Sequence, residues 1–378
     1  MNRSILIIAG EASGDNVGGL LCEEVKRLRS DIRLFGLGGD RMKNAGVEIL
    51  YHIDRLSFLG FWEIVRHIPF MRSVESNLLL EMDKEKPVLA ILIDYPGFNL
   101  RFARKLKSRG IPVLYYVSPQ VWAWGRNRIQ KIKSLVDKMI VVFEFEKELY
   151  SREGMEVEWF GHPLLDIIKP GLSGADFHNK AGLENDQRYI GLFPGSRLQE
   201  VERILPIMRD SVRTVRSKGM DVMSIVGGAP GIEDSFYRKI IGDDFTLMKN
   251  MTYDIMANAD LNLVASGTAT LECAILGKPL FVLYKTSPLT YYIAKNLVKI
   301  PDIGLVNVVA GKRIVPEFIQ SDCNTENIAG KISDYFSNES YRGKMAGDLE
   351  NVRSKLGQKG ASRKAAESVL KMLSGAWN

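Results

Sequence analysis

The chain has 378 residues, a length that suits two domains, each with its own hydrophobic core. Hydrophobic residues make up 46% of it and charged residues 25%, as in ordinary globular proteins, which excludes a disordered or collagen-like chain. Its net charge is +6. Its three cysteines lie far apart and indicate neither a disulfide framework nor a zinc site. No apolar run approaches the ~18 residues of a membrane-spanning helix. These features predict a cytoplasmic protein.

The first half alternates strands, glycine turns and helices. Apolar runs predict strands at 4–9, 32–37, 88–93, 113–117, 138–142 and 157–160. Gly10-Glu-Ala-Ser-Gly-Asp15 and a helix follow the first run, and Asp94 and a second helix follow the third. Continuous apolar strands that alternate with helices indicate a parallel sheet covered on both faces.

Residues 58–72 form an aromatic and aliphatic segment with basic residues at intervals. Read as a helix, the segment has a broad apolar face, which is typical of a core helix interrupted at Pro69. A helix lying in a membrane surface, with Phe61, Trp62 and Phe70 against the bilayer, is the competing interpretation. It is favoured by residues 101–133, which contain nine Lys or Arg and no Asp or Glu and would attract anionic lipid.

The same alternation restarts in the second half, after a stretch at 169–180 that we expect to be a linker. Strands are predicted at 189–193, 221–226, 261–265 and 280–284. The expected fold is therefore α/β, with two doubly wound Rossmann-like domains that face a central cleft. We place the domains at 1–168 and 169–345, followed by a C-terminal helical segment, 346–378, that could pack back on the first domain.

Two loops of the second half are suited to phosphate. Pro194-Gly-Ser-Arg197 combines backbone N–H groups with a guanidinium, which binds phosphate oxygens in a bidentate manner. Ser266-Gly-Thr-Ala-Thr-Leu-Glu272 places small residues at the start of a helix, where Glu272 could accept hydrogen bonds from ribose hydroxyls. Capping of that helix by Ser266 or Thr268 is the alternative. Neither a dinucleotide-binding nor a P-loop motif occurs, which disfavours nicotinamide enzymes and P-loop ATPases.

Candidate site residues of the first half follow predicted strands. Asp94 could take a proton from a substrate hydroxyl, and an Asx turn before Pro96 is the alternative. His162, in a Gly-His-Pro turn, is a candidate base or phosphate contact. Tryptophans in Ser118-Pro-Gln-Val-Trp-Ala-Trp124 either line a pocket or pack beneath it. The four histidines show no metal-ligand spacing and no D-x-D triplet occurs, so we expect no metal and no cofactor.

The motifs at 9–15, 118–124, 161–163, 194–197 and 266–272, and Asn307 with Glu317, occur in order along the chain. With them the chain resembles the lipid-A-disaccharide synthases, bacterial glycosyltransferases of GT-B type, over essentially its whole length. That resemblance implies an inverting transfer of 2,3-diacylglucosamine from UDP-2,3-diacylglucosamine to 2,3-diacylglucosamine 1-phosphate, which yields the β-1,6 lipid A disaccharide 1-phosphate and UDP. The chain departs from the family pattern at Gly97 and Val306, where Asp and Pro are usual.

The resemblance also implies roles for individual residues. Asp94 would take the proton from the acceptor 6-hydroxyl, with Glu11 as a second candidate for this base. Ser13, Gly14, Gln120, Trp122 and His162 would contact the acceptor or line the cleft. UDP-sugar binding would involve Gly195, Ser196, Arg197, Ser266, Gly267, Thr268, Ala269, Thr270, Glu272, Asn307 and Glu317. Arg197 and the helix start at 266–270 would stabilise the leaving UDP in place of a metal ion.

The partners implied are these two glycolipids and the anionic surface of the inner membrane, on which the protein would be peripheral, and no nucleic acid. Two alternatives remain open at this stage. One is another GT-B enzyme, either a UDP-sugar epimerase or a transferase with a different lipid acceptor. The other is a non-catalytic nucleotide-binding protein of the membrane surface.

Overall fold

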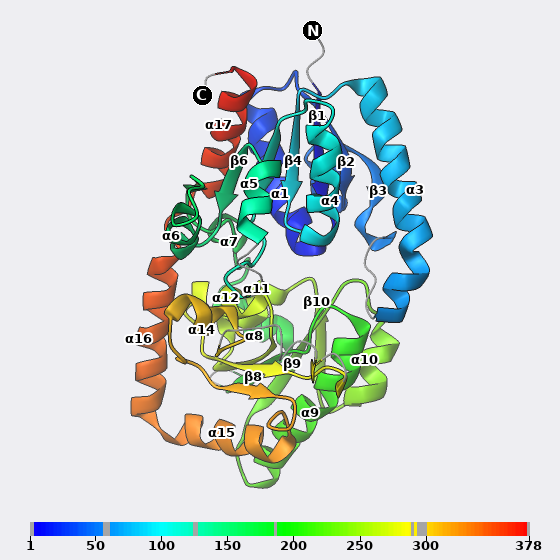
Figure 1. Ribbon diagram of the computed structural model, residues 1–378. Helices are drawn as coiled ribbons and strands as arrows, with labels where there is room; N and C mark the ends of the chain where they lie inside the picture. Colours follow the sequence, from blue (N-terminus) through cyan, green and yellow to red (C-terminus); the bar gives the residue numbers. More distant parts are fainter. Residues whose placement is uncertain are drawn as a thin grey trace. The chain divides into compact units, whose positions relative to one another are not determined.

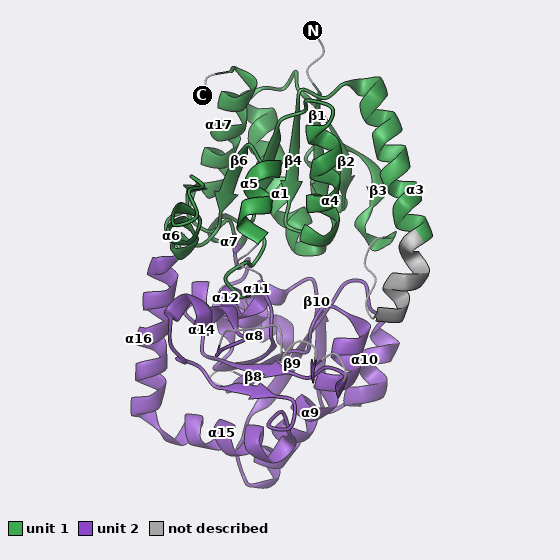
Figure 2. Ribbon diagram, viewed as in Figure 1, with its two compact units in different colours: residues 1–167, 356–378 green, residues 168–355 purple. Residues whose placement is uncertain are grey.

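A computed structural model describes residues 4–55, 61–123, 128–184, 187–288, 291–292 and 301–375, and of 61–68 only the helical backbone. The chain divides into two compact units, shown in Figures 1 and 2. Unit 1 comprises residues 1–167 and 356–378, and unit 2 comprises residues 168–355. The chain thus returns to unit 1 at Leu356, whereas the sequence placed the start of a C-terminal segment at 346.

Unit 1 is built on a parallel sheet with the strand order β3-β2-β1-β4-β5-β6-β7. Its strands are β1 (Ser4–Ala9), β2 (Arg33–Gly38), β3 (Val47–His52), β4 (Leu89–Ile93), β5 (Val113–Tyr116), β6 (Lys138–Val141) and β7 (Glu158–Trp159). Its helices are α1 (Ala12–Leu28), α2 (Asp40–Asn44), α3 (Phe61–Glu85), α4 (Pro96–Lys107), α5 (Ile129–Leu135), α6 (Glu144–Ser151), α7 (Leu164–Ile167) and α17 (Ala361–Leu373), with a 3-10 turn at Ile53–Arg55. The central strands β1 and β4 are buried along their whole length, as their continuous apolar sequences require.

Unit 2 repeats this architecture with the order β10-β9-β8-β11-β12-β13. Its strands are β8 (Tyr189–Phe193), β9 (Met223–Gly228), β10 (Thr246–Lys249), β11 (Leu261–Ala265), β12 (Leu280–Tyr284) and β13 (Glu317–Ile319). Its helices are α8 (Gly174–Ala181), α9 (Leu198–Ser217), α10 (Asp234–Ile241), α11 (Thr252–Asn258), α12 (Ala269–Ile275), α14 (Leu305–Ala310), α15 (Thr325–Ser337) and α16 (Glu339–Lys355). Two Rossmann-like parallel sheets, one in each unit, confirm the predicted fold class.

The predicted linker at 169–180 is wrong in its second part, because α8 occupies it. Ser173 caps this helix by accepting a hydrogen bond from the backbone N of Asp176. Phe177 is fully buried and stacks on Tyr189 of β8, with 5.7 Å between ring centroids. The glycines and serine that suggested a flexible connection therefore start a short helix that belongs to the core of unit 2.

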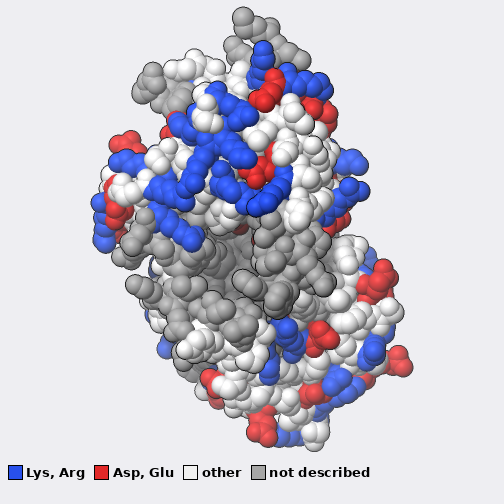
Figure 3. Space-filling model, turned by 45° about the vertical axis from the view of Figure 1, so that its right-hand side comes forward, with Lys and Arg blue, Asp and Glu red and all other residues white. Residues whose placement is uncertain are grey.

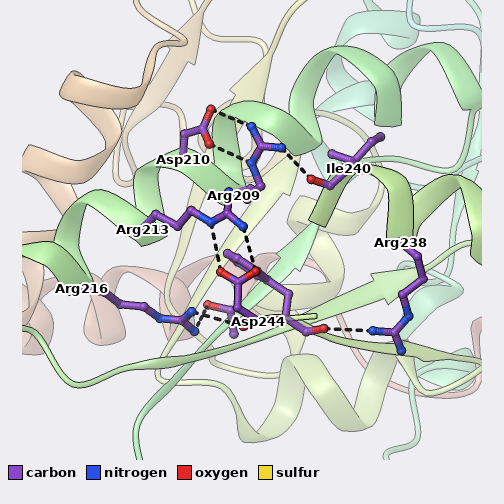
Figure 4. Close-up of polar contacts among 9 residues, drawn as sticks. Arg209, Asp210, Arg213, Arg216, Arg238, Ile240 and Asp244 are labelled. Atoms are coloured by element: carbon purple, nitrogen blue, oxygen red, sulfur yellow. Dashed lines mark hydrogen bonds and ion pairs between the residues drawn. The ribbon is translucent and has the colours of Figure 1, made fainter. Parts of the chain in front are cut away.

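Arginines of α9 fix this helix to the segment that leads into β10 (Figure 4). Arg213 forms a bidentate pair with Asp244, at 3.0 and 2.8 Å, and Arg209 donates to the carbonyl of Ile240 at 2.6 Å. Arg216 lies over the ring of Phe245, 5.0 Å from its centroid, and donates to the carbonyl of Val222 at 2.8 Å. These contacts attach the C-terminal half of α9 to the neighbouring segments of unit 2.

Candidate active site

In each sheet the strand order reverses at one point, and parallel α/β sheets bind ligands there, beyond the carboxyl ends of the two central strands. In unit 1 the reversal lies between β1 and β4, where Ala9 pairs with Ile93. Asp94 follows Ile93 directly in the chain, and Glu11 follows Ala9 after Gly10. In unit 2 it lies between β8 and β11, so that the loops at 194–197 and 266–270 share one edge. The sequence motifs therefore meet at the reversal point of each unit.

Asp94 has an unusual backbone. Its φ angle is +45° and that of Tyr95 is +47°, a left-handed backbone conformation that residues other than glycine seldom adopt. The carbonyl of Asp94 accepts hydrogen bonds from Tyr115 Oη at 2.5 Å and from Asn99 Nδ2 at 2.7 Å, which hold this turn in place. Strain that the surroundings impose in this way is typical of functional sites.

Burial raises the pKa of Asp94 from 3.8 to about 6, and the nearby negative charge of Glu11 adds to the rise. A carboxyl group with such a pKa is ionised at neutral pH but binds a proton far more readily than an ordinary aspartate. Both properties suit a general base that takes a proton from a hydroxyl. The geometry thus favours Asp94 over Glu11 as the base and gives Glu11 a supporting electrostatic influence.

The loop at 10–15 packs against the Asp94 turn. A Cβ on Gly10 would lie 2.2 Å from the ring of Tyr95, so this close approach requires glycine. Ser13 is exposed in the first turn of α1, where it is open to a ligand, whereas Gly14 is buried. Asp15 is buried and accepts hydrogen bonds from the backbone N atoms of Gly39, Arg41 and Met42, which fixes the start of α2.

A buried glutamate that sequence reasoning missed supports the loop at 118–123. Glu146, at the start of α6, accepts a hydrogen bond from the hydroxyl of Ser118 and two from the backbone N atoms of Val142 and Phe143, at 3.2 and 3.1 Å. Burial raises its pKa to about 7. The only signal in the sequence is the capping pattern that a Glu at the third helical position makes.

The side chains of this loop differ in exposure. Gln120 is exposed and open to a ligand. Trp122 is half-buried and packs edge-on against Phe143 and Phe145, at 6.4 and 5.8 Å between ring centroids. Of the two interpretations of this tryptophan, the structure supports packing. Trp124 lies outside the described residues.

His162 is a structural residue. It is buried beside Phe143, and its Nδ1 accepts a hydrogen bond from the backbone N of Leu164 at 3.2 Å. Burial lowers its pKa to about 3, so the ring is neutral at physiological pH and is a poor proton acceptor. The prediction of a base or phosphate contact at His162 finds no support in this geometry.

In unit 2 the loop at 194–197, which the sequence predicts to bind phosphate, leads directly into α9. Gly195 has a φ angle of +117°, and a Cβ there would meet the side chain of Glu200 at 2.3 Å. Ser196 is exposed, and Arg197 precedes the first residue of α9 with 40% of its side chain exposed. The guanidinium of Arg197 lies 3.6 Å from Glu200, which holds it near the end of β8.

The second loop that the sequence predicts to bind phosphate, at 266–270, connects β11 to α12. Ser266 donates to the carbonyl of Ile303 at 3.1 Å, and the buried Thr270 donates to the carbonyl of Gly267 at 2.9 Å. Gly267, Thr268 and Ala269 are at least partly exposed, so the backbone between the two anchored hydroxyls is accessible. Neither Ser266 nor Thr268 caps the helix through its side chain, which removes the capping alternative.

Burial raises the pKa of Glu272 to about 7, with a hydrogen bond to Tyr253 opposing the rise. This carboxyl therefore changes protonation state near neutral pH. In either state it offers an oxygen that can accept a hydrogen bond from a hydroxyl. Its predicted contact with ribose remains a prediction.

Asn307 and Glu317 bind each other and the backbone. Asn307 Nδ2 donates to Glu317 Oε1 at 2.8 Å, and its Oδ1 accepts from the N atoms of Ile314 and Val315. Glu317 accepts from the N atom of Gly304 at 2.9 Å, at the start of α14. Both side chains hold the segment leading into α14 in place, and their direct contact with UDP-sugar remains a prediction.

Several of the basic residues at 101–133 in unit 1 form ion pairs with acidic residues from outside this run. Lys and Arg gather on one face of unit 1 (Figure 3). Arg101 and Lys105 pair with the buried Glu75, Lys107 pairs with Asp137, and Arg109 pairs with Asp83. The expectation of nine uncompensated cations is therefore wrong, because acids from outside the run neutralise four of them.

Helix α3 contains the predicted membrane-facing segment and continues through Pro69 to Glu85. Phe70 is half-buried and packs edge-on against Tyr51, at 6.4 Å, so it contributes to the core of unit 1. The side chains of Phe61 and Trp62 lie outside the described residues. No helix in the described ranges is long and apolar enough to cross a membrane.

The model of the family described as lipid-A-disaccharide synthetase matches residues 5–372. The chain belongs to this family. A lipid-A-disaccharide synthase of Geobacter sulfurreducens is 40% identical over 375 residues, which cover 98% of both chains. One of Coxiella burnetii is 38% identical over 368 residues, which cover 97% of this chain and 98% of the relative. The predicted family is confirmed, and the chain is an enzyme, a hexosyltransferase of lipid A biosynthesis.

Solved structures support the GT-B fold of this chain. The UDP-GlcNAc 2-epimerase of Neisseria meningitidis, bound to UDP-GlcNAc, has a TM-score of 0.67 at 16% identity, covering 98% of this chain and all of the epimerase chain. MurG of Acinetobacter baumannii has a TM-score of 0.56 at 14% identity, again covering 98% and 100%. At these identities the likeness shows the fold alone, and the predicted GT-B-type fold is confirmed.

Proposed function

We propose that this chain transfers 2,3-diacylglucosamine from UDP-2,3-diacylglucosamine to the 6-hydroxyl of 2,3-diacylglucosamine 1-phosphate, with inversion. The observation that carries the proposal is the position of Asp94 in a chain of this family: it lies at the reversal point of the sheet of unit 1, and its pKa is raised. The acceptor oxygen forms the new bond to the sugar, the bond from the sugar to UDP breaks, and Asp94 takes the hydroxyl proton. UDP leaves with the electron pair of the broken bond.

Unit 2 supplies the leaving-group site in this proposal. Arg197 and the accessible backbone at 267–269 bind the diphosphate of the donor and stabilise the charge that builds up on it. Glu272 accepts a hydrogen bond from a ribose hydroxyl. Because these groups supply positive charge themselves, the reaction proceeds without a metal ion.

Unit 1 holds the protein at the anionic surface of the inner membrane. The substrates carry acyl chains, whose transfer into water costs about 0.8 kcal/mol for each CH₂ group, so the enzyme works beside the bilayer. Of the basic residues at 101–133, Arg104 and Lys131 are exposed and form no ion pair with a described residue, so they can face anionic lipid. Trp62 and Phe61 add apolar insertion.

The reaction is tested by incubating the purified protein with both glycolipids and following UDP and disaccharide phosphate by mass spectrometry. Equal amounts of the two products support the transfer. Turnover of UDP-sugar without an acceptor would indicate an epimerase, and UDP binding without turnover would indicate a non-catalytic protein.

Membrane binding is tested separately by co-sedimentation with vesicles. Binding to anionic vesicles should weaken at high salt, since salt screens charge but not apolar insertion. Replacement of Phe61 and Trp62 by Ser should remove the salt-resistant part without unfolding the protein. Unfolding of that variant would place the segment in the core.

A further inference from the structure

A pocket of about 500 Å³ lies within unit 2, one strand away from the loops assigned to the diphosphate. It lies at the carboxyl ends of β12 and β13, where Tyr284 pairs with Ile319, and Arg203 in the second turn of α9 lines one side of it. The residues that line it include Arg203, Lys285, Thr286, Ser287, Gln320 and Ser321. No role in the reaction proposed above uses this Arg203–Lys285 pocket.

The wall of the pocket is held in place by a pair of hydrogen bonds. The backbone N of Thr286 donates to Oε1 of Gln320 at 2.7 Å, and Nε2 of Gln320 donates to the carbonyl of Thr286 at 3.2 Å. This reciprocal contact ties the segment after β12 to the segment after β13. The two sides of the pocket are therefore positioned before any ligand arrives, which lowers the entropic cost of binding.

The pocket carries positive charge that no ion pair among the described residues neutralises. Lys285 Nζ donates to the carbonyl of Cys323 at 3.1 Å, a contact with a neutral group that leaves the ammonium charge in place. Arg203 is exposed on α9 and forms no ion pair with a described residue. Glu200, one turn earlier on the same helix, is paired with Arg197. Two cations and three hydroxyl-bearing residues thus surround one space.

We infer that the Arg203–Lys285 pocket binds a phosphomonoester, which is the phosphate of the acceptor if the proposed function, on which this assignment rests, is correct. A phosphomonoester carries about −1.5 to −2 charges near pH 7 and has three strong acceptor oxygens. The planar guanidinium of Arg203 suits two of these oxygens, and the ammonium of Lys285 acts as a second point charge. By contrast, each phosphate of a UDP-sugar carries about one negative charge, and the loops at the reversal point of unit 2 are already assigned to bind that diphosphate.

Direct binding is tested by calorimetric titration of the full chain with glucosamine 1-phosphate, a soluble probe without acyl chains, and with glucosamine. The wild type should bind glucosamine 1-phosphate and should not bind glucosamine. Arg203→Gln should weaken binding by about tenfold or more, because a contact between charged groups is lost. Lys239→Gln removes an exposed cation on α10 and is the matched control. Equal binding by all three proteins, or binding by none, overturns the inference.

Kinetics with acceptors that carry or lack the phosphate assign the ligand. In Arg203→Gln and Lys285→Gln, KM for the phosphorylated acceptor should rise about tenfold while kcat and the Kd of UDP stay unchanged. Weaker UDP binding in these variants would place the pocket in the donor site and overturn the inference. Thermal unfolding of Lys285→Gln checks that the lost contact with Cys323 has not unfolded unit 2.

Vesicle binding distinguishes an acceptor phosphate from a lipid headgroup phosphate. The variants should sediment with anionic vesicles as the wild type does. Reduced sedimentation together with an unchanged acceptor preference would identify a headgroup site and overturn the assignment to the acceptor. If the wild type transfers no sugar to any acceptor, the proposed function fails, and the titration with glucosamine 1-phosphate still decides whether the pocket binds a phosphomonoester.

Discussion

Replacing Asp94 with Asn should abolish most activity and at the same time stabilise the fold. Asn has nearly the same shape and tolerates the left-handed backbone at this position, whose φ angle is +45°. It cannot accept the proton of the acceptor hydroxyl, so kcat should fall by about 10²–10⁴ while the affinity for UDP stays constant. The stability gain follows from the pKa of the carboxyl that is removed.

Asp94 is an acid whose pKa is higher in the folded chain, about 6, than the ordinary value of 3.8. The folded state therefore binds its proton more tightly than the unfolded state, and folding stability falls as the pH rises from about 4 to about 6. Each pKa unit corresponds to about 1.4 kcal/mol, which sets an upper limit of about 3 kcal/mol above pH 6. Since the side chain is partly exposed and Asn must also leave water, we expect a gain of about 1–2 kcal/mol.

Urea-induced unfolding at about pH 8 and about pH 4 measures this difference. The variant should be more stable than the wild type at the higher pH, and most of this difference should disappear at the lower pH, where the carboxyl is protonated in the folded state and partly protonated in the unfolded chain. A variant that is less stable at both pH values and equally active for each folded molecule would make Asp94 a turn residue. That result would refute the assignment of the base.

Four further predictions concern the neighbouring groups. Glu11→Gln removes a negative charge beside Asp94, so the acid limb of the pH profile of kcat/KM should move down by up to about one pH unit, whereas loss of activity at every pH would identify Glu11 as the base. Arg197→Ala should cost about 2–4 kcal/mol in transition-state stabilisation, measured from kcat/KM, and a change below about twofold would limit Arg197 to its contact with Glu200. Glu146→Gln places an NH₂ group where a carboxyl oxygen accepts hydrogen bonds, so at about pH 4, where its raised pKa of about 7 adds little cost of buried charge, the free energy of unfolding should fall by about 1–3 kcal/mol, and an unchanged urea midpoint at that pH would contradict the supporting role. Activity should persist in excess EDTA, and a loss that Mg²⁺ or Mn²⁺ restores would show a metal requirement.

The central strands were predictable because they are buried on both faces and read as continuous apolar runs. Those at 4–9, 189–193, 261–265 and 280–284 have the predicted bounds. The strands that the sequence did not reveal, β3, β10 and β13, all lie at the edges of their sheets. An edge strand is partly exposed, so polar residues such as Glu48 and Lys249 interrupt its apolar pattern.

The candidate site was predictable where a residue lies in the loop that follows a central strand, as Asp94 and Arg197 do. It was not predictable where a side chain acts through contacts that are distant in sequence. The bond of Glu146 to Ser118 spans 28 residues, and the ion pairs of Glu75 with Arg101 and Lys105 neutralise a run that contains no acid of its own. The burial of His162, which lowers its pKa to about 3, was likewise not evident from its residue type, and its contact with a ligand remains a prediction.

Because residues 356–378 belong to unit 1, the order in which the chain is synthesised differs from the order of its units. Unit 2 is one uninterrupted stretch and can complete its core as soon as α16 leaves the ribosome. Synthesis of unit 1 begins first, but its core is complete only after α17 has been made, because α17 packs against α1. The backbone N of Gly360, just before α17, donates a hydrogen bond to Oδ1 of Asp166 at 2.6 Å. A chain that stops after α16 therefore contains both Glu11 and Asp94 but lacks the helix that covers α1 beneath them.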